Sequence, residues 1–121
     1  MQKNVLCPVC GKYVFEKEND FDICPVCEWE NDGVQMDKHD YWGGANELSV
    51  NQYRMHYELS LMKEKETSLK DIDTAHRTVD IEIYQKYCGE NQRITDSEKL
   101  FAELRDEHDK YVELLISLLN A

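Results

Sequence analysis

The sequence predicts a small α+β protein, in which an N-terminal β-hairpin carrying two cysteine pairs precedes a bundle of about three α-helices. Three observations support this fold class. Four of the five cysteines form two close pairs before residue 28, short strand-like runs lie between the pairs, and apolar residues recur at helical spacing after residue 49. We therefore divide the 121 residues into a cysteine-bearing module over residues 1–48 and a helical region over residues 49–121.

The tetrapeptide Cys-Pro-Val-Cys occurs twice, with thirteen residues between the two copies. A C-x₂-C turn supplies two adjacent corners of a tetrahedron of thiolates, so two such turns complete a closed zinc site. A proline restricts φ in each turn, and Gly11 tolerates the positive φ that a tight turn requires. The spacing predicts one structural Zn²⁺ ion with four ligands, which are Cys7, Cys10, Cys24 and Cys27.

Three other uses of these cysteines are less consistent with the sequence. A disulfide framework requires an oxidising compartment, and the first residues lack the apolar segment of a signal peptide, so we expect a cytoplasmic protein with reduced thiols. A thioredoxin-like dithiol uses a single C-x-x-C in a βαβ setting, which is not the pattern here. A single iron, as in rubredoxin-like electron carriers, favours a longer segment between the pairs, although recombinant protein can take up iron in place of zinc.

The segment between the pairs predicts two short strands. Residues 12–16 alternate like a strand, residues 17–20 resemble a turn, and residues 21–23 form a second short strand. A knuckle, a hairpin and a second knuckle are the plan of a zinc ribbon, so we expect residues 12–16 to pair with residues 21–23.

Three stretches, "CPVCG", "DICPVCEWENDGVQ" and "DYWGGANELSVNQYRMHYE", resemble the cysteine-rich CPCC family of small bacterial proteins over about residues 5–58. The resemblance implies a zinc-ribbon-like metal-binding module, and it implies no reaction. Family members typically have Cys-Pro-Cys-Cys at the first pair, whereas Val9 stands in the third position here. The residues that carry the resemblance are Cys7, Pro8, Cys10, Gly11, Asp22, Cys24, Pro25, Cys27, Trp29, Asp32, Gly33, Gln35, Gly43, Gly44, Ala45, Asn46, Ser49 and Tyr57.

A loop rich in Asp, Asn and Gly follows the second pair. We expect Trp29 to cover the small core beside the metal, because it lies two residues from Cys27. Tyr41 and Trp42 are candidate partner-binding residues, since aromatic side chains among polar neighbours are common at protein interfaces. The sequence contains no nucleophile–base pattern, phosphate-binding loop or calcium-binding loop, so we do not expect an enzyme.

Three helices are expected after residue 48. Ser49 and Gln52 form a capping box that opens a helix to about Lys65, a second helix begins near "SLKD" and ends before Gly89, and Thr95 with Glu98 caps the last. The last two helices predict an antiparallel hairpin, with Cys88 as a small buried residue. The expected apolar stripes are Val50, Tyr53, Tyr57, Leu61 and Met62; Ile72, Ala75, Val79, Ile83 and Tyr87; and Leu100, Phe101, Leu104, Tyr111, Leu115 and Leu118.

The tail "YVELLISLLNA" carries more apolar residues than one neighbouring helix can cover, so Ile116 and Leu119 are candidates for binding a partner or a second copy in a homodimer. The net charge of −11 disfavours nucleic-acid binding. The sequence contains no run of 18 apolar residues, so we expect no membrane span. We expect a zinc-stabilised protein–protein interaction module of a bacterium or phage. Its specific form would be an inhibitor or immunity-type protein that acts on a basic, nucleic-acid-handling partner. A nucleic-acid-binding zinc ribbon and a rubredoxin-like iron carrier are the alternatives.

Overall fold

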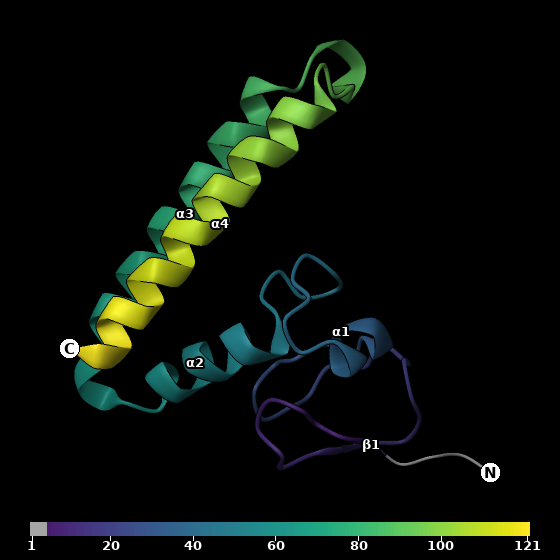
Figure 1. Ribbon diagram of the computed structural model, residues 1–121, viewed down its shortest axis with the longest axis vertical. Helices are drawn as coiled ribbons and strands as arrows, with labels where there is room; N and C mark the ends of the chain where they lie inside the picture. Colours follow the sequence, from purple (N-terminus) through teal and green to yellow (C-terminus); the bar gives the residue numbers. More distant parts are fainter. Residues whose placement is uncertain (1–4) are drawn as a thin grey trace. The chain divides into compact units, whose positions relative to one another are not determined.

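The computed structural model describes residues 5–121, which divide into two compact units with the boundary between Leu61 and Met62. The first unit contains the short strands and helices α1 and α2, and the second contains the long helices α3 and α4 (Figure 1). The fold is α+β with an N-terminal two-stranded hairpin, as the sequence predicts. The first expected helix belongs to the cysteine-bearing unit, so this boundary lies later than residue 48. No helix between residues 5 and 121 is long and apolar enough to cross a membrane.

Each cysteine pair lies at the turn of its own short antiparallel hairpin. Around the first pair, β1 (Val5–Leu6) pairs with β2 (Val14–Phe15). Around the second pair, a single bridge joins Ile23 and Glu30. The expected pairing of residues 12–16 with residues 21–23 is therefore wrong, because each of these segments pairs with the other flank of its own cysteine pair.

The reason is that each knuckle folds back tightly enough for its own flanks to bond. The Cys7 N–H donates to the carbonyl oxygen of Tyr13 at 2.8 Å, and the Cys24 N–H donates to that of Trp29 at 2.8 Å. The inner faces of both hairpins form the core of the first unit, which includes the thiols themselves. Its buried members are Cys7, Phe15, Cys24, Cys27, Trp29 and Val50.

Three buried polar side chains hold the loop that follows the second hairpin. Asp32 caps α1 (Gly33–Asp37) by accepting from the N–H groups of Val34 and Gln35, and its other oxygen accepts from Ala45 at 2.9 Å. The Gln35 amide nitrogen contacts the carbonyl oxygens of residues 41, 46 and 48. The Asn46 amide bonds both backbone groups of Glu30, at 2.9 and 2.8 Å. The loop is therefore an ordered part of the fold.

Helix α2 (Val50–Ser60) begins with the predicted capping box between Ser49 and Gln52. It ends five residues before the expected Lys65, so Leu61 lies outside the helix and is 63% exposed, while Leu59 is buried. The assignment of Leu61 to the apolar stripe is therefore wrong.

The second unit is the predicted antiparallel hairpin. After the 3₁₀ turn η1 (Lys63–Lys65), α3 (Glu66–Lys86) and α4 (Ser97–Asn120) run side by side, joined by a loop that contains η2 (Glu90–Gln92) (Figure 1). Asp96, rather than the expected Thr95, caps α4 by accepting from the Lys99 N–H at 3.1 Å. At the other end of α4, the Lys65 ammonium group donates to the carbonyl oxygens of Leu118 and Ala121.

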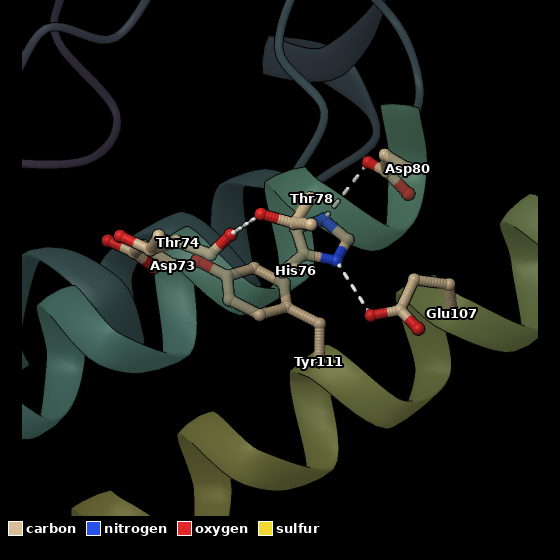
Figure 2. A network of polar contacts seen from close by, with 7 residues as sticks. All are labelled: Asp73, Thr74, His76, Thr78, Asp80, Glu107 and Tyr111. Carbon is tan, nitrogen blue, oxygen red and sulfur yellow. Dashed lines mark hydrogen bonds and ion pairs between the residues drawn. The ribbon is translucent and has the colours of Figure 1, made fainter. Parts of the chain in front are cut away.

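A polar network occupies the middle of the seam between α3 and α4 (Figure 2). The buried His76 ring lies between Asp80, at 3.3 Å, and Glu107, at 3.2 Å, and it stacks on Tyr111 with 4.0 Å between ring centres. The Tyr111 hydroxyl donates to Asp73 at 2.5 Å. The apolar periodicity does not reveal this arrangement, and two residues assigned to the stripes, Ala75 and Phe101, are exposed.

Candidate metal centre

The sulfur atoms of Cys7, Cys10, Cys24 and Cys27 all lie within 4.8 Å of one another. The Cys7 and Cys27 sulfurs are 3.5 Å apart, and the Cys10 and Cys24 sulfurs are 3.6 Å apart. A zinc ion bound at about 2.3 Å from each thiolate has about 3.8 Å between neighbouring sulfurs. The four side chains therefore fit one tetrahedral metal ion, and the structure brings together the four residues that the cysteine spacing predicts.

The two knuckles repeat each other in detail. In the first, the Gly11 N–H donates to the carbonyl oxygen of Cys7 at 3.0 Å, and in the second the Glu28 N–H donates to that of Cys24 at 2.8 Å. Both donors have a left-handed backbone, with φ of 65° at Gly11 and 68° at Glu28. Glycine adopts this conformation without strain, whereas glutamate does so at a cost.

Backbone N–H groups also point at two of the sulfurs. Lys12 N lies 3.4 Å from Cys10 Sγ, and Val26 N lies 3.4 Å from Cys24 Sγ. Such donors stabilise thiolate charge and orient the ligands. They act in the same sense as a metal ion, which favours the deprotonated sulfur.

Helix α2 holds both knuckles through two consecutive side chains. The Tyr53 hydroxyl donates to the carbonyl oxygen of Cys27 at 2.9 Å, and Arg54 Nε donates to that of Pro8 at 2.8 Å. The Tyr53 ring also meets Trp29 edge to face, with 5.3 Å between ring centres. The helix thereby joins the two halves of the cysteine cluster from outside.

The thiols differ in their electrostatic surroundings. Burial raises the pKa of Cys7 and of Cys27. Partial burial opposes ionisation of Cys10 as well, but the Lys12 N–H and the neighbouring thiols outweigh it and lower the pKa of that group. Burial also raises the pKa of Tyr53, so its hydroxyl remains protonated and able to donate to Cys27. A bound cation would bring all four thiols into the thiolate form.

The family described as "Cysteine-rich CPCC" matches residues 5–72, which is more than half of the chain. The chain belongs to the cysteine-rich CPCC family. The match extends beyond the expected residue 58 into the start of α3, so it includes all of α2 and the side chains that hold the knuckles. Val9 of this CPCC protein packs partly buried against the core. No curated protein matches the chain.

The other singled-out residues fall in different places. Trp29 is fully buried, as the sequence predicts. Tyr41 is 44% exposed and Trp42 is half-buried, both in the first unit; Ile116 is 42% exposed and Leu119 is half-buried, both in the second. Their role in binding a partner stays a prediction.

Cys88 is exposed, which corrects the expectation of a small buried residue. It follows α3 and forms a single bridge with Ile94 in the exposed loop between the two long helices, so no helix face covers it.

Sequence reasoning missed the polar residues that hold the site. The helical periodicity places Tyr53 in an apolar stripe, and no sequence motif indicates a role for Arg54. A capping box that places a helix soon after the second knuckle is a signal for such contacts, but it does not name the carbonyl groups that accept. Gln35 and Asn46 belong to the residues that carry the family resemblance, but the resemblance implies no role for them.

Proposed function

We propose that this protein is a zinc-stabilised protein–protein interaction module. The observation that carries the proposal is the closed cluster of four cysteines within the core of the first unit. Four thiolates fill a tetrahedron and leave no position for water or substrate, which is the arrangement of structural zinc rather than catalytic zinc. The coupled folding energy of such sites, roughly 10–16 kcal/mol, is enough to hold a unit with so few buried aliphatic side chains.

Charge indicates the kind of partner. The whole chain carries a net −11, and four thiolates around Zn²⁺ add a further negative charge to the first unit. An acidic protein is steered towards basic surfaces. We propose a basic partner, and as a specific version an inhibitor or immunity-type role towards a nucleic-acid-handling enzyme of a bacterium or phage. The same charge argues against direct binding to DNA or RNA.

Exposed or half-buried apolar side chains supply candidate contacts in both units. We propose Tyr41 and Trp42 in the first unit, and Ile116 and Leu119 in the second, as partner-binding residues. The two residues on α4 also suit packing against a second copy of the chain.

The first experiment is elemental analysis of the purified protein. We expect one zinc per chain and colourless protein; a red protein that cycles reversibly between oxidation states would instead favour an iron electron carrier.

The second experiment is affinity capture at low and at moderate salt, with the Tyr41→Ala and Trp42→Ala double variant beside a matched Tyr84→Ala control. We expect one basic protein to be retained at low salt only, and lost with the double variant. If the double variant and the Tyr84→Ala control retain the same protein equally at both salt concentrations, the proposed surface is wrong.

A mobility shift with duplex DNA at low salt distinguishes the nucleic-acid alternative. We expect no retardation, and salt-sensitive retardation by the zinc-loaded protein would overturn the proposal.

A further inference from the structure

The four thiols of the metal centre are not equally accessible. Cys7, Cys24 and Cys27 are 2%, 0% and 8% exposed, whereas Cys10 is only half-buried. The position that corresponds to Cys10 in the second knuckle is Cys27, so the difference breaks the repeat between the two knuckles.

The cause of the difference lies in what covers each knuckle. A Cβ added at Gly11, next to Cys10, would meet no heavy atom within 4 Å, so the space beside the first knuckle is open. Beside Cys27, the rings of Trp29 and Tyr53 meet edge to face, and the Tyr53 hydroxyl donates to the Cys27 carbonyl group. Arg54 bonds the first knuckle at the carbonyl group of Pro8.

One sulfur close to that of Cys10 belongs to the other knuckle. Cys10 Sγ lies 3.6 Å from Cys24 Sγ, across fourteen residues of sequence. A disulfide bond requires about 2.05 Å, so the two sulfur atoms must approach each other by about 1.5 Å to form one. The other close pair, Cys7 and Cys27, is buried.

We infer that Cys10 is the reactive thiol of the metal centre, whose sulfur attacks hydroperoxides and soft electrophiles, and that after oxidation by a hydroperoxide Cys24 closes a Cys10–Cys24 disulfide. The inference rests on the proposed zinc site and adds a form of regulation to it. Thiolates that solvent can reach are the ones that react, and buried ones are protected.

The Cys10 thiolate attacks the peroxide, the O–O bond breaks, and one oxygen leaves as water or an alcohol after taking a proton from solvent, while Cys10 becomes a sulfenic acid. The Cys24 thiolate attacks Cys10, an S–S bond forms, the S–O bond breaks and the second oxygen leaves as water after taking a second proton from solvent. Two electrons pass from the two sulfurs to the peroxide. Two thiolates remain, Cys7 and Cys27, and these are too few to retain zinc in a closed site.

The test uses the full chain with the Cys88→Ser substitution, which removes the exposed thiol outside the cluster. Zinc content is measured first. The zinc-loaded protein is then treated with N-ethylmaleimide for increasing times, and each cysteine is followed by peptide mass spectrometry. We expect Cys10 to react at least about tenfold faster than the other three cluster cysteines, since reactivity follows access to the thiolate. In denaturant with a chelator, which is the control, the four should react at similar rates.

Substoichiometric hydrogen peroxide tests the second step. We expect zinc, detected with a coloured chelator, to be released in proportion to the peroxide added. After the remaining thiols are alkylated, a disulfide should link Cys10 to Cys24. Trypsin leaves each cysteine pair on one peptide, so fragmentation of the linked peptides assigns the partners.

Equal alkylation of the four thiols, a first disulfide between Cys7 and Cys27 or within either knuckle, or zinc retention after oxidation would overturn the inference. These outcomes in a protein that holds one zinc leave the proposed function intact. A chain that takes up no zinc would overturn both.

Discussion

The hydroxyl group of Tyr53 and the carbonyl oxygen of Cys27 are 2.9 Å apart, and this hydrogen bond joins helix α2 to the second knuckle of the metal centre. The next residue, Arg54, makes the corresponding bond to the first knuckle. Helix α2 therefore bonds both knuckles of the cysteine cluster, although it lies far from them in the sequence.

Replacing Tyr53 with phenylalanine removes this bond and retains the ring contact with Trp29. We expect the free energy of unfolding of the zinc-loaded protein to fall by about 1–2 kcal/mol, because the Cys27 carbonyl group loses a buried donor. Urea titration followed by tryptophan fluorescence measures the change. The control is Tyr41→Phe at an exposed position, and an equal loss in both variants would contradict the role of the bond.

Glu28 occupies the left-handed conformation that Gly11 adopts in the first knuckle. The comparison variant is Glu16→Gly, at an exposed position without positive φ. We expect the free energy of unfolding of Glu28→Gly to exceed that of Glu16→Gly by about 1–2 kcal/mol, since only the first substitution relieves strain. Both variants lose the same charge and gain the same freedom in the unfolded chain.

Glu28→Gln separates strain from charge, because it removes the carboxylate near the thiolates and retains the side chain. If Glu28→Gln stabilises the protein as much as Glu28→Gly in urea titrations, the backbone explanation is wrong.

Gln35 is fully buried, and its amide contacts three backbone carbonyl oxygens and accepts from Asn46. We expect Gln35→Leu, of similar volume, to lower the free energy of unfolding of the first unit by about 2–4 kcal/mol, because several buried polar groups lose their partners. Gln85→Leu on the exposed face of α3 is the control, with an expected change near zero. Comparable losses in the two variants would mean that the network contributes little.

Removal of the metal is expected to unfold the first unit through α2 and to leave α3 and α4 folded. The thiols form much of the core of the first unit, whereas the helical hairpin has its own seam. Hydrogen exchange before and after addition of a chelator measures this residue by residue. Protection that persists in residues 50–60 after zinc is lost would refute the coupling between α2 and the knuckles.

Lys86 donates to Glu103 at 2.8 Å, and this hydrogen bond lowers the pKa of Glu103. A carboxyl group with a lowered folded-state pKa stabilises the fold above its ordinary value of 4.5, and that contribution is lost as the pH falls through the lowered value. Lys86→Met should therefore lower the thermal midpoint of the α3–α4 hairpin slightly at neutral pH, and this effect should disappear as the pH falls below the lowered pKa of Glu103. Circular dichroism of this variant beside Lys110→Met provides the measurement, and a difference between the two that persists in acid would exclude the ion pair as its cause.

The sequence was sufficient to predict the four clustered cysteines, the capping box at Ser49 and the hairpin of long helices, because each depends on short-range spacing. It was insufficient where contacts depend on how backbone groups meet in space. The pairing of each knuckle's own flanks is one example. Another is His76, whose two carboxylate neighbours and aromatic partner lie one or more helical turns away or on the opposite helix.

Polar residues in the core explain most of the remaining differences. Gln35 and Asn46 are amides whose partners are main-chain atoms up to sixteen residues distant, and apolar periodicity contains no information about them. Cys88 shows the opposite failure, since a residue type that is usually buried lies on an exposed loop.

Because the two hairpins nearly repeat each other, the metal centre resembles one ion bound between two identical peptides. In such a pair, occupancy would depend on the concentration of the peptide itself, because two separate molecules must meet. Here the few residues between the hairpins replace that encounter with the closure of a short loop, which costs little entropy and is independent of concentration. Filling of the site should therefore follow the free metal level alone, whether the cell holds few copies of the protein or many.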